Sequence, residues 1–401
     1  MKKFAAAMAL VGLAGAASAE PDPKDWDSVL AAAKGQTVYW NAWGGSTATN
    51  DFIAWAGDQI EAQYGVKLEH VKLSDTADAV SRVVAEKAAG KDSGGAVDLI
   101  WINGANFAAM KENELLFGPF AEDLPNFALI DTEQNTSVTS DFTVATEGLE
   151  SPWAMAQVVF YYDTARLAEP PKSMKALLDW AAANPGRFTF PQPPDFLGTT
   201  FLKQALFDLA EDTSVLAEPV SDDSYDAVAD PLWAWLDQLT PHMWRSGKAY
   251  PQTGPQQLQM MGDGEIDLAI SFSPGEASTA IANGQLPDTV RTFVLDGGTI
   301  GNASFVAIPY NASAKEGAMV LANFLLSPKA QANAQDPNVL GYGTVLTMDR
   351  LSNEERAMFD ALELGIATLT PAELGASLPE PHPSWMTRIE ADWTNRYGVS
   401  Q

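Results

Sequence analysis

The chain has 401 residues, of which 46% are apolar, and 52 acidic side chains against 24 basic ones give it a formal net charge of -28. Since domains average roughly 150 residues, this length predicts two or three of them, and the apolar content is sufficient for packed cores. The negative charge would repel nucleic-acid phosphates and anionic membrane surfaces, so we expect no nucleic-acid partner. The lack of cysteine excludes disulfides, thiolate metal sites and catalytic thiols.

The first residues have the pattern of a secretory signal peptide. Lys2 and Lys3 form a basic start, residues 4–16 an apolar stretch, and Ala17-Ser18-Ala19 a cleavage motif. The apolar stretch, about 13 residues, is shorter than the roughly 20 needed to span a membrane. We therefore expect residues 1–19 to be removed on export, which leaves a periplasmic protein without membrane insertion or a lipid anchor.

Buried-strand runs alternate with helical periodicity in the first part of the mature chain. The pattern predicts, in order, a helix over 26–34, a strand over 37–40, a helix over 50–64, a strand over 67–73, a helix over 77–89, a strand over 97–102 and a helix over 107–116. This alternation is typical of right-handed crossovers in a parallel sheet. We therefore expect the first domain to be an open α/β sheet.

A long strand over 151–163 is predicted to carry the chain into a second α/β unit. Its expected elements are a helix over 173–183, a strand over 188–190, helices over 199–209, 230–239 and 256–261, and a strand over 267–272. After a strand over 301–309, Ser313 and Glu316 have the spacing of a capping box before a helix that ends ahead of Pro328. The acidic remainder from 337 is expected to form helices and loops.

Motifs of the common enzyme classes are scarce. The histidines, His70, His242 and His382, do not have metal-ligand spacing, and neither a nucleophile elbow nor a phosphate loop occurs. We therefore expect no metal site, no cofactor and no catalytic residues. A carboxylate pair, as in a secreted glycan hydrolase or lyase, remains an alternative.

Polar and aromatic residues follow the predicted strands, where open α/β sheets bind their ligands. Helix N-termini there leave N–H groups free for a ligand, and aromatic faces with a carboxylate suit a cationic group. Each residue could instead be an ordinary turn, cap or core residue. The candidate ligand-binding residues are Trp43, Gly44, Gly45, Ser46, Asn103, Asn106, Trp153, Tyr162, Asp195, Phe196, Thr199, Ser271, Phe272 and Glu276.

Three segments resemble the extracytoplasmic solute-binding proteins of ATP-binding-cassette importers, in their two-lobed type II form. They are VDLIWINGANFAAMKENELLFGPF at 97–120, a crossing segment at 151–167 that ends in FYYDTARL, and FVAIPYNASAKEGAMVLANFLLSPKAQ at 305–331. The resemblance implies two α/β lobes, each an open, mostly parallel sheet flanked by helices, with a ligand cleft between them. The implied first lobe comprises 20–155 and 300–345, and the second comprises 156–299 and 346–401.

The same resemblance implies a monomeric periplasmic receptor, not an enzyme, that closes on a small solute and delivers it to an inner-membrane permease. Within the family the chain is similar to the YnjB-type branch, usually labelled as thiamine-transport receptors, which favours a thiamine-like organic cation. A polyamine, an oxyanion or ferric iron remain alternatives, the last because Tyr161 and Tyr162 are adjacent. A protein whose main partner is the permease or a sensor is a further possibility.

Overall fold

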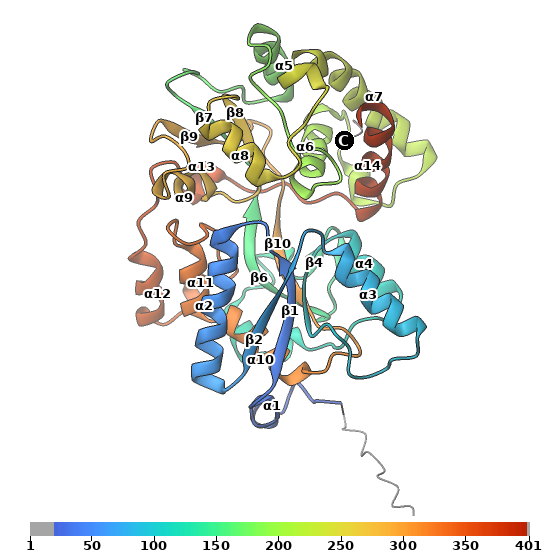
Figure 1. Ribbon diagram of the computed structural model, residues 1–401, viewed down its shortest axis with the longest axis vertical. Helices are drawn as coiled ribbons and strands as arrows, with labels where there is room; N and C mark the ends of the chain where they lie inside the picture. The colour runs from blue at the N-terminus through green and yellow to red at the C-terminus, as the bar shows by residue number, and fades with distance from the viewer. Residues whose placement is uncertain (1–19, 399–401) are drawn as a thin grey trace, which may run out of the picture.

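The computed structural model describes residues 20–398, which form two lobes joined by crossing strands (Figure 1). The predicted signal peptide lies outside the described residues. Lobe I, the lower half of Figure 1, begins with α1 (Trp26–Ala33), β1 (Thr37–Trp43), α2 (Thr47–Tyr64), β2 (Lys67–Leu73), α3 (Ala77–Ala88), β3 (Leu99–Ile102) and α4 (Ala105–Glu112). The predicted alternation of strands and helices is therefore confirmed in this lobe.

Lobe I is built on a five-stranded sheet in the order β2-β1-β3-β10-β6, which includes β6 (Glu150–Gln157) and β10 (Gly301–Ala307). β1 pairs in parallel with β2 and β3, as the crossovers predicted. β10 is antiparallel to both β3 and β6. β6 and β10 run side by side toward lobe II, so these two strands carry the chain out of lobe I and back (Figure 1).

Lobe II contains a three-stranded sheet in the order β8-β7-β9, formed by β7 (Val159–Asp163), β8 (Leu268–Ser271) and β9 (Val290–Phe293). β7 is antiparallel to both neighbours, so the expectation of a mostly parallel sheet is wrong for this lobe. The cause is topological, because β7 continues the crossing strand after a break at Val158 and enters between two strands that run the other way. At 188–190, where a strand was predicted, Phe188 forms an isolated bridge to Leu268.

Helices surround the small sheet of lobe II. They are α5 (Met174–Ala183), α6 (Phe196–Leu209), α7 (Asp222–Leu239), α8 (Gly254–Gly262), α9 (Glu276–Ala282), α13 (Pro371–Leu374) and the C-terminal α14 (Pro383–Tyr397). α6 is buried along most of its length, and α14 packs against it. α14 also contacts α4 of lobe I, so the two lobes meet on this side of the crossing strands (Figure 1).

Two helices of lobe I follow β10 directly: α10 (Lys315–Leu325) and α11 (Pro328–Gln335). The predicted capping box is wrong, because Ser313 donates its hydroxyl to the Gly95 carbonyl (2.7 Å) and Glu316 instead accepts a hydrogen bond from Gln36 (3.0 Å). Pro328 does not simply stop the preceding helix. It occupies the first turn of α11, where its missing N–H costs nothing.

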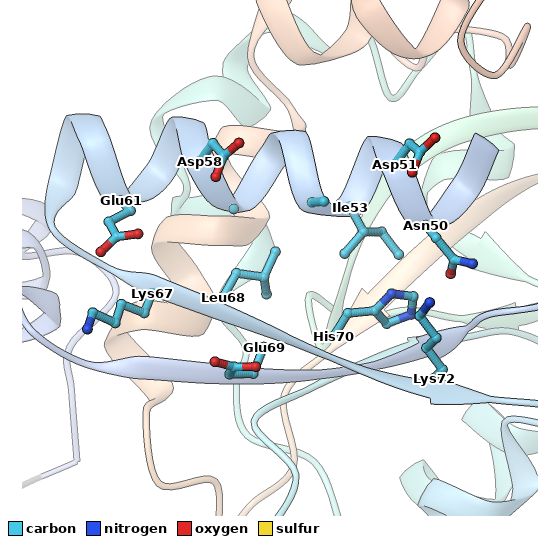
Figure 2. A pocket seen from close by; sticks show the side chains of 12 residues that line it. Asn50, Asp51, Ile53, Asp58, Glu61, Lys67, Leu68, Glu69, His70 and Lys72 are labelled. Carbon is cyan, nitrogen blue, oxygen red and sulfur yellow. The ribbon is translucent and has the colours of Figure 1, made fainter. Parts of the chain in front are cut away.

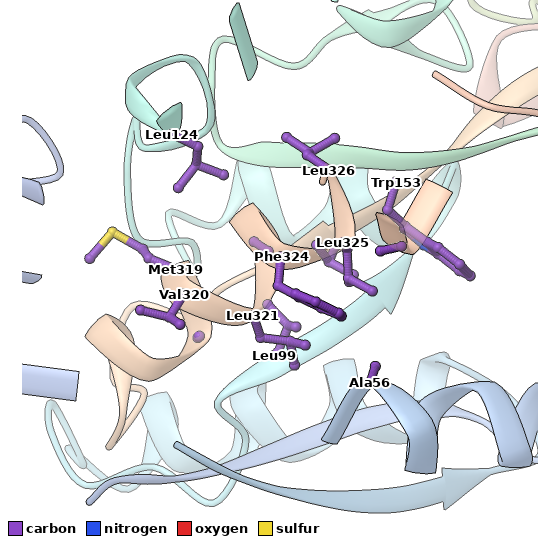
Figure 3. Close-up of a cluster of buried hydrophobic side chains, with 14 of the residues drawn as sticks. Ala56, Leu99, Leu124, Trp153, Met319, Val320, Leu321, Phe324, Leu325 and Leu326 are labelled. Atoms are coloured by element: carbon purple, nitrogen blue, oxygen red, sulfur yellow. The ribbon is translucent and has the colours of Figure 1, made fainter. Parts of the chain in front are cut away.

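Each lobe has its own hydrophobic core. In lobe I, Trp153 and Phe324 lie in a cluster that joins the sheet to α10 (Figure 3). Leu351 and Phe359, the latter on α12 (Asn353–Asp360), belong to the same cluster. Residues 346–360 therefore pack in lobe I rather than in lobe II, where we had expected them. The chain reaches lobe II by Ala367, which packs beside α9. Within residues 20–398, no helix is both long enough and apolar enough to cross a membrane.

Candidate ligand site between the lobes

The carboxyl end of β1 points toward lobe II and continues into the N-terminus of α2 (Figure 1). Ser46 caps α2 by accepting a hydrogen bond from the Thr49 amide, and Asn50 donates its amide to the Gly44 carbonyl (3.1 Å). The ring of half-buried Trp43 lies directly against Gly45, where a Cβ atom would come within 2.5 Å of it. These predicted site residues therefore order one loop at the boundary between the lobes.

Asn103 and Asp141 form a second polar group at this edge of lobe I. Asn103 donates to the carbonyl of Ala303 (2.8 Å) and to Asp141 (3.3 Å), and the Gly104 amide donates to the other oxygen of Asp141 (2.6 Å). Burial raises the pKa of Asp141 to about 8, although these hydrogen bonds oppose the shift. Asn106, another predicted residue, is half-buried in the first turn of α4.

Helix α6 brings the facing residues of lobe II to the boundary. Asp195 caps α6 by accepting from the amides of Leu197 (3.0 Å) and Gly198 (3.3 Å). Burial raises its pKa to about 6, and the negative charge of Asp75 in lobe I adds to the shift. One turn later, Thr199 donates its hydroxyl to Glu390 of α14 (2.6 Å).

Two turns beyond Asp195, Lys203 lies completely buried where the lobes meet. Its Nζ is 2.6 Å from Oε2 of Glu380, which is also buried, and the other oxygen of Glu380 accepts from Asn302 on β10 (3.0 Å). Burial raises the pKa of Glu380, and the charge of Lys203 opposes that shift. Lys203 Nζ also lies 4.4 Å from the ring centroid of Phe142 in lobe I and 5.5 Å from that of Phe196 in lobe II.

Phe142 reaches Lys203 from a tight hairpin turn between β4 (Ser140–Asp141) and β5 (Val144–Ala145). Its φ is +45° and that of Thr143 is +70°, a conformation usually adopted by Asn and Gly because other side chains are strained there. The ring is buried and rests over Gly104, yet Phe142 is outside the hydrophobic clusters of the described chain. Its ring therefore contacts both Gly104 of lobe I and Lys203 of lobe II.

At the start of α6, Phe196 forms an edge-to-face pair with Phe272, with ring centroids 5.3 Å apart. Phe196 remains 46% exposed, so one ring of the pair is accessible to solvent. Ser271 is buried and accepts a hydrogen bond from the Ser273 amide (3.0 Å). Glu276, half-buried in the first turn of α9, has a pKa that is raised by burial and opposed by hydrogen bonding from Ser271.

Near α9 the lobes touch through their backbones. Gly275 of lobe II lies so close to Gly341 of lobe I that a Cβ on Gly341 would be 2.6 Å from the Gly275 Cα. The Gly275 amide donates to the Gly341 carbonyl (3.2 Å), and Ser273 donates to the Leu340 carbonyl (3.4 Å). This approach requires glycine on both sides.

Two predicted aromatic residues lie elsewhere. Trp153 is 1% exposed and packs against Trp40, Phe52 and Trp101 in the core of lobe I. Tyr162 packs edge-to-face on Phe293 within the lobe II sheet. Both were predicted because aromatic residues near a crossing strand can face a ligand. In the structure both rings instead pack against other aromatic rings of their own lobe.

A groove of about 510 Å³ lies on the outside of lobe I, between α2 and the edge strand β2 (Figure 2). Its polar lining mixes both signs of charge, with Asp51, Asp58 and Glu69 beside Lys67 and Lys72. The predicted site residues do not line this groove. The interlobe residues and the groove are therefore separate features.

The structure adds residues that sequence reasoning missed: Asp141, Phe142, Lys203, Glu380 and Glu390. One signal was present, because Asp195, Thr199 and Lys203 are spaced four residues apart and so share a face of a helix. Nothing local in the sequence connects that face with Glu380 or Phe142. Those contacts exist only once the lobes pack together.

The geometry of two lobes joined by crossing strands agrees with a comparison of sequences. The profile of the family described as bacterial extracellular solute-binding protein matches residues 55–351. The chain belongs to this family. It is also 42% identical over 390 residues to Protein YnjB of Escherichia coli (strain K12), covering 97% of this chain and 98% of that protein. The chain is thus a solute-binding protein of an ATP-binding-cassette importer.

Solved structures share the fold at low sequence identity. The periplasmic binding protein AfuA from Actinobacillus pleuropneumoniae, solved with exogenous fructose-6-phosphate bound, matches with a TM-score of 0.64 and 16% identity, over 91% of this chain and 99% of that one. A protein from Listeria monocytogenes, provisionally named a spermidine/putrescine ABC transporter, also matches. Its TM-score is 0.59 at 19% identity, over 89% of this chain and 98% of that one. These similarities confirm the two-lobed periplasmic binding protein fold.

Proposed function

We propose that this protein is a monomeric periplasmic receptor that binds a small organic cation, such as thiamine, between its lobes. Hinge closure at β6 and β10 would trap the solute, and the closed receptor would deliver it to the inner-membrane permease. Export through a cleaved signal peptide is part of this proposal. The family membership supports the class of protein. The acidic and aromatic residues between the lobes support a positively charged ligand.

The observation that carries the proposal is a surplus of carboxylates between the lobes. Five acidic side chains of the described residues interact electrostatically there with one another or with Lys203: Asp75, Asp141, Asp195, Glu380 and Glu390. Burial raises the pKa of four of them, which means that burial disfavours their charged forms. A cationic ligand would stabilise those charged forms, whereas a phosphate would be repelled by the ionised carboxylates.

An aromatic face lies beside these carboxylates. Phe196 follows Asp195 directly and leaves 46% of its surface exposed. A flat cationic ring can stack on such a face and gain both dispersion and cation–π energy. The Phe272 ring packs edge-to-face with Phe196 and would hold the Phe196 ring in position for stacking. Thiamine has a ring of this kind, which is why we favour it over an aliphatic cation.

The other ligands suggested by the relatives fit less well. Fructose-6-phosphate, seen in AfuA, is an anion and would face the carboxylate surplus. For ferric iron, Tyr161 and Tyr162 are adjacent on β7, and adjacent strand residues point to opposite faces. Tyr161 is 1% exposed and packs with the α9 cluster, whereas Tyr162 packs on Phe293. This pair is not arranged to hold one ion.

Isothermal titration calorimetry on the purified mature protein tests the proposal. Thiamine, butylammonium, putrescine, fructose-6-phosphate and ferric citrate would be titrated separately at low salt. We expect binding of thiamine, and we expect Phe196→Ala to weaken it by about tenfold, equivalent to about 1.4 kcal/mol. Tyr39→Ala is the matched control, because Tyr39 is a similarly exposed aromatic residue (45%) at a position on β1 distant from α6.

Binding of fructose-6-phosphate or ferric citrate, with none of the organic cations bound, would refute the proposed ligand while leaving the family assignment intact. Turnover of a glycan that is lost on changing Asp195 to Asn would instead support the enzyme alternative. Asp195 is the residue to change because it is the half-buried carboxylate closest to the exposed ring in sequence.

A further inference from the structure

Strand β2 forms one edge of the lobe I sheet, so about half of its backbone groups face away from the other strands. The Lys67 amide donates to the Gln36 carbonyl (2.9 Å), and the Leu73 carbonyl accepts from the Gly44 amide (2.9 Å), so these groups of β2 point toward β1. The direction alternates along a strand, so every second residue faces the open edge. Within residues 20–398 the amides and carbonyls on that edge have no hydrogen-bonding partner, and they belong to Leu68, His70 and Lys72.

Helix α2 packs on β2 beside this open edge, and the groove of about 510 Å³ lies between the two elements (Figure 2). The helix approaches the strand closely at Gly57, where a Cβ atom would come within 3.1 Å of the Leu68 Cβ. A second hollow, of about 470 Å³, follows at the end of α2 and shares Glu61 with the groove. Together they extend along α2 from Asn50 to Tyr64, roughly 20 Å at 1.5 Å per residue, which is the length of about six extended residues.

Three carboxylates line the groove from one flank of α2. Asp51, Asp58 and Glu61 are seven and three positions apart, a spacing that places them on the same face of a helix. All three side chains are exposed, and in the described part of the chain none of them forms an ion pair or a side-chain hydrogen bond. We call these three residues the acidic row. Because the row is unpaired, basic side chains of another molecule would find carboxylates free to bind them.

Two lysines of β2 also line the groove. Lys67 and Lys72 lie near its opposite ends, and Asp58 lies between them in this view (Figure 2). Charged residues on an edge strand commonly protect it from unwanted pairing, and these lysines have that pattern. Such protection requires nothing from α2, so it does not explain why the helix presents an unpaired acidic row beside the same edge.

We propose that the open edge of β2 and the acidic row together dock an extended, basic segment of a partner protein. The segment would pair its backbone with the open edge, as a sixth strand of the lobe I sheet, and its lysine or arginine side chains would bind the acidic row. Backbone pairing supplies affinity for any extended segment, and the acidic row selects a basic one. The groove is separate from the site between the lobes, so this inference does not depend on the identity of the solute.

Three forms of one synthetic peptide test the backbone pairing. The peptide has six residues, alternating lysine and valine, with both ends capped. It would be titrated into the mature protein at low salt, unmodified, N-methylated at every lysine, or N-methylated at every valine. The two methylated forms have the same charge and mass, but each lacks the N–H groups of a different edge of the extended peptide. We expect the unmodified peptide to bind, and we expect only one methylated form to lose about tenfold or more in affinity, because one edge alone faces β2.

Two double variants of the protein test the role of the acidic row. We expect Asp58→Asn/Glu61→Gln to weaken binding of the unmodified peptide by about fivefold, as for the loss of two exposed ion pairs. Asp226→Asn/Asp230→Asn is the matched control, because it removes the same charge from exposed positions of α7 in lobe II. Hydrogen–deuterium exchange locates the contact, since bound peptide should slow exchange over residues 66–74.

The inference is overturned if the unmodified peptide does not bind, which would leave the lysines of β2 as protection of the edge. It is also overturned if the two methylated forms behave alike, because backbone pairing would then play no part. Equal weakening by the two double variants would overturn it as well, since the peptide would then respond only to the net charge of -28. Each of these results leaves the proposed solute binding to be tested by its own titrations.

Discussion

Lys203 Nζ and Glu380 Oε2 lie 2.6 Å apart, and both side chains are buried where the two lobes meet. Removing two charges from water is costly, and the attraction between them offsets that cost only when the remaining polar atoms are also satisfied. Asn302 satisfies the second oxygen of Glu380, and the rings of Phe142 and Phe196 face the ammonium. This pair thus joins α6, the crossing strand and the C-terminal segment at one point.

Breaking the pair should destabilise the protein strongly. We expect Lys203→Met to lower the free energy of unfolding by about 3–5 kcal/mol, because it leaves Glu380 buried without a counter-charge. Lys203→Met/Glu380→Gln should recover most of this loss. Urea denaturation followed by circular dichroism measures it, and Lys175→Met, at an exposed pair, should change stability by less than about 0.5 kcal/mol. Equal losses at Lys203 and Lys175 would contradict the importance of burial.

Asp141 should make the stability depend on pH. Burial raises its pKa from 3.8 to about 8, so between these values the folded protein holds a proton that the unfolded chain has released. The free energy of unfolding must then fall as the pH rises through this interval. Urea denaturation between about pH 5 and 8 should show this fall, and Asp141→Asn should make the curve flatter. Parallel curves for the two proteins would refute the assignment to Asp141.

Cation binding should respond to pH in the opposite direction. Burial raises the pKa of Asp195 to about 6, and a cationic ligand stabilises its charged form. Binding should therefore release protons below about pH 7, and affinity for thiamine should increase as the pH rises from about 5 to 7. Calorimetry in two buffers of different ionisation enthalpy measures the protons released. Asp195→Asn should reduce that number, and an unchanged number would assign the protons to another group.

Gly341→Ala should hinder closure. The new Cβ would lie 2.6 Å from the Cα of Gly275 on the other lobe. We expect a more open particle in small-angle X-ray scattering and ligand affinity reduced by about tenfold, or about 1.4 kcal/mol. Gly284→Ala is the control, because Gly284 also has a positive φ (+71°) but open space at its Cβ, so it shares the backbone strain of about 1–2 kcal/mol without the contact. The same scattering curve for both variants would contradict this role.

Trp153 should affect folding rather than recognition. Its ring is covered by Trp40, Phe52 and Trp101, so Trp153→Ala should cost about 3–5 kcal/mol in the free energy of unfolding. Trp153→Phe, which keeps an aromatic ring, should cost less. Calorimetry on the folded fraction should give ligand affinities within about twofold of wild type. A large loss of affinity with little loss of stability would instead place Trp153 in the ligand site, as its position near the crossing strand first suggested.

Local patterns in the sequence were enough for most of lobe I. The β1–α2–β2–α3–β3 order could be predicted because buried strands and amphipathic helices have different periods, and because parallel neighbours need helical crossovers. Lobe II was harder. β9 has only four residues, too few for a clear pattern of alternating burial. In lobe I, α11 begins at a proline, a residue that typically marks the end of a helix, so the sequence did not predict α11. The ligand-binding role of the predicted residues stays a prediction.

The sequence by itself determined the two α/β units, the family, the acidic charge and the polar loops after β1 and β3, because each depends on residues close together in the chain or on composition. Only the tertiary structure decided which residues meet between the lobes. Lys203 and Glu380 are 177 positions apart, and Phe142 reaches Lys203 from the other lobe. Such contacts depend on how two separate cores pack on each other, and the local periodicity of the sequence does not predict that packing.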